Sequence, residues 1–181
     1  MNPLKKWSIA GAAFTLVAGA LLHFVYDWWG GPVWAAVGTV NESTWEHIKL
    51  LFWPVLLFGM VEYGVYGKHL SCFLPVKALS LLLGMATIIV LFYTYTGILG
   101  YHIPAVDIAI FGVATAATYS WAYHRLAQSN RHCPVWARAA SLAVLAALVA
   151  CFLLFTYSPP KIALFLDPVS GAYGIASNPL L

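Results

Sequence analysis

The chain has 181 residues, of which 62% are apolar and only 8% charged, and its mean hydropathy is +0.82. Soluble domains carry about a quarter charged residues, so this composition excludes an ordinary soluble fold. Nine basic and six acidic residues give a net charge of +3, too small a bias to predict nucleic-acid binding. We therefore expect a multi-pass protein of the cell membrane, with the lipid bilayer as its main partner.

Five apolar stretches are each close to the roughly 20 residues that a helix needs to cross a bilayer. Because lipid offers no hydrogen-bond partners, a segment that crosses it must satisfy its own backbone, and we expect these stretches to be helical. The predicted fold class is an all-α integral membrane protein, a bundle of about five transmembrane helices. The predicted spans are Ser8–Trp28, Trp45–Tyr66, Val76–Thr96, Ile103–Tyr123 and Trp136–Tyr157.

We expect these spans to form one domain over residues 1–158, followed by an extracytoplasmic tail over residues 159–181. The tail contains an apolar run, Ile162–Leu166, that is too short to cross a bilayer and too apolar to be solvated. Pro168 and Gly171 then indicate a turn. The tail is therefore expected to lie against the outer mouth of the bundle, as a lid or an interfacial foot.

The distribution of basic residues predicts the orientation of the bundle. Seven lysines and arginines fall at one end of the predicted spans and two at the other. By the positive-inside rule the richer end is cytoplasmic, which places the N-terminus inside and, after five spans, the tail outside. The seven are Lys5, Lys6, Lys68, Lys77, Arg125, Arg131 and Arg138, and the two are Lys49 and Lys161.

Familiar chemical motifs are missing from the sequence. Cys72, Cys133 and Cys151 lie far apart without paired spacing, which predicts neither a disulfide framework nor a zinc knuckle. We find no HExxH pattern, nucleotide-binding motif, haem-attachment motif or nucleophile elbow. Any functional site must therefore be inferred from where ionisable residues gather.

Most acidic residues and three histidines fall at the predicted outer ends of the spans, where ionisable groups are costly and suggest a functional site. On the first span, Gly11, Thr15, Gly19, His23 and Asp27 follow at intervals of four residues. Small residues allow close helix packing, so this stripe is expected to face the bundle and carry His23 inward. His23 and Asp27 then form either a structural pair or a ligand or general base oriented by a carboxylate.

The segment Asn41–Lys49 opens the second span. Ser43 and Glu46 have the spacing of a capping box, and Glu46 can also pair with Lys49 three residues later. A structural role therefore accounts well for Glu46. It accounts less well for Glu42 and His47, which makes them better candidates for a site.

Three further ionisable residues have structural explanations. Asp107 lies in the first turn of the fourth span, where an acidic residue is favoured by the helix dipole. His102, in the preceding loop, is either solvated or an additional site residue. Glu62 lies near the inner end of the second span, where Lys68 or Lys77 could neutralise it.

The short connection between the first two spans predicts that His23 and His47 approach each other near the outer surface, with Glu42 or Glu46 beside them. Mixed imidazole and carboxylate ligands suit a divalent metal such as zinc, manganese or ferrous iron. The candidate metal ligands are His23, Glu42, Glu46 and His47, and the candidate catalytic residues are His23, Asp27 and His47.

Four segments are distinctive: LHFVYDW from Leu22 to Trp28, VNESTWEHIKLLFWP from Val40 to Pro54, FYTYTGILG from Phe92 to Gly100, and PPKIALFLDPVSGAYGI from Pro159 to Ile175. Together they resemble a family of small bacterial and archaeal membrane proteins that is catalogued only as a domain of unknown function. The resemblance covers nearly the whole chain in order and implies the five-span fold. It implies no catalytic or binding residues.

Two classes of function remain open from the sequence. The first is a metal-dependent membrane enzyme or metal-binding protein with an outward-facing His/Glu/Asp site, which could take a lipid or small molecule at the outer face. The second is a non-enzymatic binding, transport or assembly subunit, in which the same residues are structural or couple to protons or cations. The absence of an inverted repeat argues against a self-contained transporter.

Overall fold

The computed structural model describes residues 2–128 and 132–175. Within these ranges the chain is almost entirely helical, and its strand-like pairing is limited to one bridge between Leu166 and Tyr173. In chain order the helices are α1 (Pro3–Trp29), α2 (Gly31–Val37), α3 (Thr44–Val65), the 3-10 helix η1 (Gly67–His69), α4 (Phe73–Leu99), α5 (Pro104–Leu126), α6 (Val135–Tyr157) and the 3-10 helix η2 (Ala163–Phe165).

The five-span prediction is confirmed: α1, α3, α4, α5 and α6 are each long and apolar enough to cross a membrane. Most of them extend beyond the predicted spans by a few residues, because a helix can continue past the apolar run that defines it. The short helix α2 was not predicted. Its seven residues begin with Gly31 and Pro32, a pair that is typical of a turn but that also suits the first turn of a helix.

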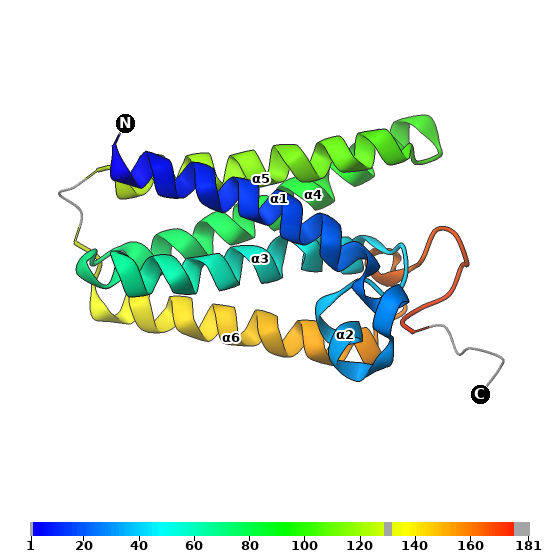
Figure 1. Ribbon diagram of the computed structural model, residues 1–181. Coiled ribbons are helices and arrows are strands. Elements are labelled where there is room, and N and C mark those ends of the chain that lie inside the picture. Colours follow the sequence, from blue (N-terminus) through cyan, green and yellow to red (C-terminus); the bar gives the residue numbers. More distant parts are fainter. Residues whose placement is uncertain (1, 129–131, 176–181) are drawn as a thin grey trace.

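The long helices run along one common direction, with the described start of the chain at one end and the tail at the other (Figure 1). We call these the N-terminal end and the tail end. Helix α4 packs against α3, α5 and α6, whereas α1 packs against α3 and α5. Helix α2 lies at the tail end, where it contacts the ends of α1, α3 and α6 (Figure 1).

The small-residue stripe of α1 faces the bundle, as predicted. Gly11, Thr15 and Gly19 are all buried. The Thr15 hydroxyl lies 2.9 Å from the Tyr119 hydroxyl of α5, within hydrogen-bond distance. The stripe therefore holds α1 close to its neighbours and sets the direction of the next turn.

Gly19 marks a point where three helices come together. A Cβ atom there would lie 2.5 Å from the Phe111 ring of α5 and 2.8 Å from the Leu50 carbonyl oxygen of α3. Because Pro54 has no N–H, that carbonyl has no donor four residues later, and the backbone of α1 packs against it instead. His23 follows one turn after this contact, at the tail end.

Two lysine–carboxylate pairs are buried in the bundle. Lys49 lies 2.5 Å from Glu46, the pair that the sequence suggested, and Glu62 pairs with Lys77, one of its two predicted partners. The Tyr66 hydroxyl also donates a hydrogen bond of 2.7 Å to Glu62. Burial and this hydrogen bond raise the pKa of Tyr66, so its hydroxyl remains a donor.

The prediction that the cysteines do not pair is wrong, because Cys72 and Cys133 form a disulfide. The two residues are 61 positions apart and belong to different loops, one before α4 and one before α6. The packing of α4 between α3, α5 and α6 brings both loops to the N-terminal end. The spacing of the two cysteines in the sequence does not indicate that they lie close together.

The orientation of the bundle in the membrane stays a prediction, and the disulfide makes its test more informative. Disulfides form mainly in oxidising compartments, whereas the basic residues at the N-terminal end predict the cytoplasm. A labelling experiment distinguishes these two indications directly.

With the N-terminal end inside, a membrane-impermeant maleimide added to intact cells should label Val169→Cys in the tail and leave Ala127→Cys unlabelled. Both positions are exposed, and permeabilised cells should show labelling of both. The wild-type chain is the control, since Cys72 and Cys133 are bonded and Cys151 lies within α6. Labelling of Ala127→Cys alone would reverse the predicted topology.

Candidate functional site

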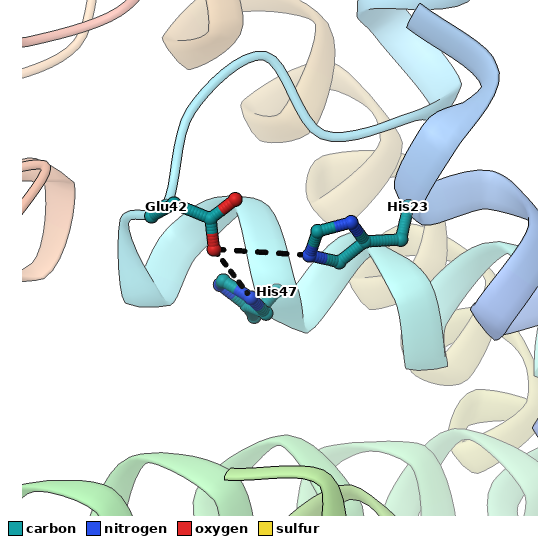
Figure 2. A group of neighbouring side chains, drawn as sticks. All are labelled: His23, Glu42 and His47. Carbon is teal, nitrogen blue, oxygen red and sulfur yellow. Dashed lines mark ion pairs between the residues drawn. The ribbon is translucent and has the colours of Figure 1, made fainter. Parts of the chain in front are cut away.

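His23, Glu42 and His47 form a compact group at the tail end of the bundle (Figure 2). The Nε2 atoms of His23 and His47 lie 3.7 and 3.4 Å from the same oxygen of Glu42. The two rings are 5.4 Å apart between centroids, so the predicted approach of His23 and His47 is found. One ligand atom from each of the three residues lies within 4.8 Å of the other two.

The hydrogen bonds of the rings determine which nitrogen faces the group. The Nδ1 atom of His47 lies 3.0 Å from the Ser43 carbonyl oxygen, which can only accept, so Nδ1 carries a proton and Nε2 is the nitrogen that faces Glu42. His23 also presents Nε2, while its Nδ1 is buried without a hydrogen-bond partner. The two imidazoles, His23 foremost, hold the pKa of the Glu42 carboxyl well below its usual range.

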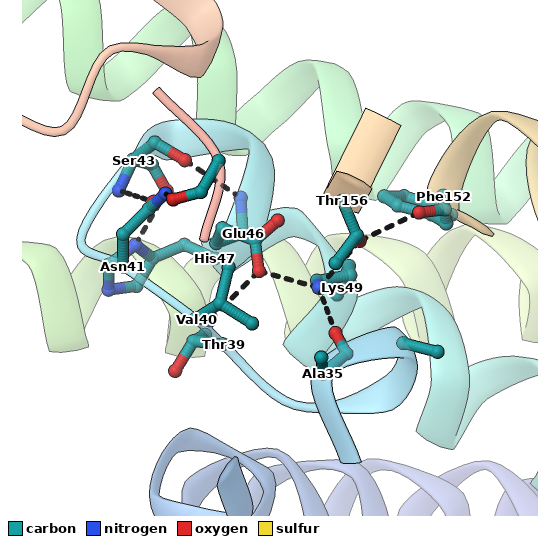
Figure 3. Close-up of polar contacts among 12 residues, drawn as sticks. Ala35, Thr39, Val40, Asn41, Ser43, Glu46, His47, Lys49, Phe152 and Thr156 are labelled. Atoms are coloured by element: carbon teal, nitrogen blue, oxygen red, sulfur yellow. Dashed lines mark hydrogen bonds and ion pairs between the residues drawn. The ribbon is translucent and has the colours of Figure 1, made fainter. Parts of the chain in front are cut away.

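The loop that carries Glu42 is fixed by hydrogen bonds on both sides (Figure 3). The Asn41 side chain accepts from the Ser43 N–H at 2.9 Å, and the Ser43 hydroxyl caps α3 by accepting from the Glu46 N–H at 3.4 Å. Glu46 completes the loop by accepting from the Val40 N–H at 3.0 Å. In a usual capping box Glu46 would accept from the N–H of the N-cap residue, Ser43. Here it accepts from Val40 instead, and the loop that this bond closes contains Glu42.

Lys49 ties this loop to the rest of the bundle (Figure 3). Its ammonium group donates to the Ala35 carbonyl of α2 at 2.8 Å and to the Thr156 hydroxyl of α6 at 3.1 Å, besides its pair with Glu46. All three partners are buried, so the charges are neutralised without water. The position of Glu42 therefore depends on α2, α3 and α6 together.

The described part of the tail packs beside the same loop. Phe165 is buried and lies 4.9 Å from the Trp45 ring and 5.4 Å from the Phe155 ring, between centroids. The Asn41 amide donates to the Gly174 carbonyl at 2.8 Å. These contacts place the apolar run of the tail on the start of α3. The last part of the predicted lid, residues 176–181, lies outside the described residues.

Two of the candidate residues are not brought into the group. Glu46 turns away to Lys49 and the Val40 N–H, so Glu42 is the carboxylate that accompanies the histidines. Asp27 is exposed, and the carboxylate beside His23 is that of Glu42. The stripe that turns His23 inward thus ends before Asp27.

A cavity of about 590 Å³ adjoins the group, a size typical of small-molecule sites. His23, Glu42 and His47 line one side of its polar part, and His102 and Asp107 line another. The remaining lining is mainly apolar and comes from α1, α3, α4, α5 and Pro168 of the tail.

The pairing of His102 with Asp107 was missed from the sequence. The His102 Nδ1 atom lies 3.2 Å from Asp107, and the Tyr95 hydroxyl donates to the other oxygen of the same carboxylate. Tyr95 also accepts from the Ile103 N–H at 3.0 Å, which fixes the start of α5. The three side chains are close in sequence, but the aromatic composition around Tyr95 favoured an interfacial role.

Comparison with known proteins adds a family but no activity. No curated protein and no solved structure matches the chain. A family model described as a family of unknown function, DUF6512, matches residues 1–175, which include all the segments that resembled an uncharacterised family. The chain therefore belongs to the DUF6512 family, a family of unknown function.

Proposed function

We propose that the protein binds one divalent metal ion, such as zinc, through His23, Glu42 and His47. The observation that supports it is the convergence of the three ligand atoms within 4.8 Å. Ligand atoms about 2 Å from a shared zinc ion lie roughly 3.3 Å apart in a tetrahedron. The two histidine–carboxylate distances, 3.4 and 3.7 Å, are close to this value, so small side-chain rotations suffice.

The ligand set also supports a catalytic role for the metal. Two histidines and one glutamate are a known composition of catalytic zinc sites, which leave a fourth position for water or substrate. Here the cavity adjoins the three ligands and supplies space for that position. A bound ion would polarise a substrate oxygen and lower the pKa of a water molecule. We therefore propose a metal-dependent membrane enzyme and leave Asp27 and Glu46 out of its site.

One observation favours the second class of function. Glu42 lies beside both imidazoles, and this arrangement can also share a proton or hold the loop to α1. The two classes differ in one measurable property, which is stoichiometric metal binding that depends on both histidines.

The purified protein is expected to bind about one zinc ion per chain. His23→Ala, Glu42→Ala and His47→Ala should each lower the zinc affinity about 100-fold or more, since even residues that only orient a ligand contribute about 10- to 100-fold. Zinc content by mass spectrometry and titration against a chromophoric chelator would measure this.

Asp27→Asn and His69→Ala are matched controls, because both residues are exposed and lie outside the group. Both variants should keep wild-type zinc content. Equal zinc content in the wild type, His23→Ala and His47→Ala would contradict the metal site and favour the non-enzymatic class.

A further inference from the structure

The cavity has a polar part and an apolar part along its length. Its polar residues gather at the tail end, and its apolar lining continues deeper between the helices. On α1 the lining runs from His23 down to Leu16, and on α5 from Pro104 down to Phe111. Seven residues of helix correspond to about 10 Å, so the apolar part reaches roughly a third of the way through a hydrocarbon core of about 30 Å.

The apolar part of the cavity is open towards the lipid. Several lining side chains remain exposed on the surface of the bundle: Leu16 by 42%, Phe24 by 48% and Ile108 by 73%. Helices α1 and α5 are in close contact at Gly19, below the polar part, and α1 runs away from α5 towards the tail end (Figure 1). A hydrocarbon chain from the bilayer can therefore reach the cavity sideways, between these two helices.

The charges at the polar part favour an anion. Lys49 offsets the charge of Glu46. The carboxylate that faces the two histidines is that of Glu42. A divalent ion bound to one carboxylate and two neutral imidazoles leaves a net charge of about +1. On the other side, the Asp107 carboxylate accepts from the Tyr95 hydroxyl and lies 3.2 Å from His102 Nδ1, and a protonated His102 would offset its charge. The polar part thus suits an oxyanion held against the metal.

We propose that the cavity binds a single-chain amphiphile with an oxyanion head group, taken from the bilayer. Its head lies against the metal-loaded His23–Glu42–His47 group, and its hydrocarbon chain lies between α1 and α5. This inference rests on the proposed metal site and names the class of substrate for it. It distinguishes a lipid-like ligand from a small water-soluble anion, which would use the polar part alone.

The test uses an alkyl phosphate with a photoreactive diazirine in its chain, added to the zinc-loaded protein in neutral-lipid nanodiscs. Crosslinks mapped by mass spectrometry are expected on the lining residues of α1 and α5. An unlabelled alkyl phosphate should compete at least tenfold better than either inorganic phosphate or the matching alkanol. Competition by inorganic phosphate at the same concentration, or by the alkanol, would overturn the proposal.

Ala20→Trp provides the decisive variant, because Ala20 lines the apolar part and is not a ligand of the metal. It should reduce crosslinking about tenfold or more while zinc content stays at the wild-type level. Leu21→Trp is the matched control, since Leu21 is exposed at the same depth but does not line the cavity. Equal crosslinking in the two variants would overturn the assignment of the chain to this cavity.

Zinc content is measured on the same samples, so that failure of the metal site is distinguished from failure of the amphiphile site. Crosslinking that requires zinc supports the proposal. Crosslinking that is equal with and without zinc would overturn the placement of the head group on the metal. Normal zinc content with no specific crosslinking would overturn the amphiphile and leave the metal site standing.

Discussion

Replacement of Lys49 with methionine is expected to lower the free energy of unfolding by about 3–5 kcal/mol, the usual effect of removing one partner of a buried ion pair. Glu46 would keep its charge in a buried position with only the Val40 N–H as a partner, and the Ala35 carbonyl would lose its donor. Unfolding in mixed detergent micelles, followed by circular dichroism, would measure the change.

The double variant Glu46→Gln/Lys49→Met should be more stable than Lys49→Met, because it removes the uncompensated charge. Lys161→Met is the control for loss of a lysine: Lys161 is exposed, so its replacement should change the stability by less than about 0.5 kcal/mol. A loss below about 1 kcal/mol in Lys49→Met would show that Glu46 is not a buried charge.

Replacement of Lys77 with methionine is expected to have an effect of the same size at the N-terminal end. Glu62 would lose its cationic partner and keep one hydrogen bond, from Tyr66. Lys77 also lies 4.9 Å from the centre of the Tyr119 ring, a cation–π contact that would be lost. The expected loss in the free energy of unfolding is again about 3–5 kcal/mol.

Lys68→Met is the natural control for this change, because the sequence allowed Lys68 as an alternative partner of Glu62 and the structure leaves it exposed. It should have almost no effect on stability. Zinc affinity should remain normal in Lys77→Met, since the pair lies away from the His/Glu/His group. Equal losses of stability in Lys68→Met and Lys77→Met would contradict a specific pairing of Glu62 with Lys77.

The helices could be predicted because each long apolar run has only one stable form in lipid. A helix satisfies its own backbone, so length and composition are sufficient. The disulfide could not be predicted, because Cys72 and Cys133 are 61 residues apart and it is the packing of the helices between them that places them side by side. Helix α2 was missed because its seven residues are too few to show a helical pattern, and because the contact that holds it comes from Lys49 on another helix.

The candidate site, too, could be predicted from the sequence only in part. The stripe on α1 and the short connection to α3 were enough to bring His23 and His47 together. The choice between Glu42 and Glu46 depended on which one took the Val40 N–H and the Lys49 ammonium group, a detail of the folded loop. The cavity depends on how α1 and α5 diverge beyond Gly19, which no pattern in either helix reveals.

The disulfide also divides the walls of the cavity into those that it ties together covalently and one that it does not. It links the loop between α3 and α4 to the loop before α6, so the ends of α3, α4, α5 and α6 are tied together at the N-terminal end. Helix α1 is not among them. It continues into α2 through Gly30 and Gly31, which both have positive φ and no neighbouring atom within 4 Å of a Cβ position. The position of the α1 wall relative to α5 therefore depends on non-covalent contacts, those of its buried small-residue stripe and of Thr15 with Tyr119, and not on the disulfide.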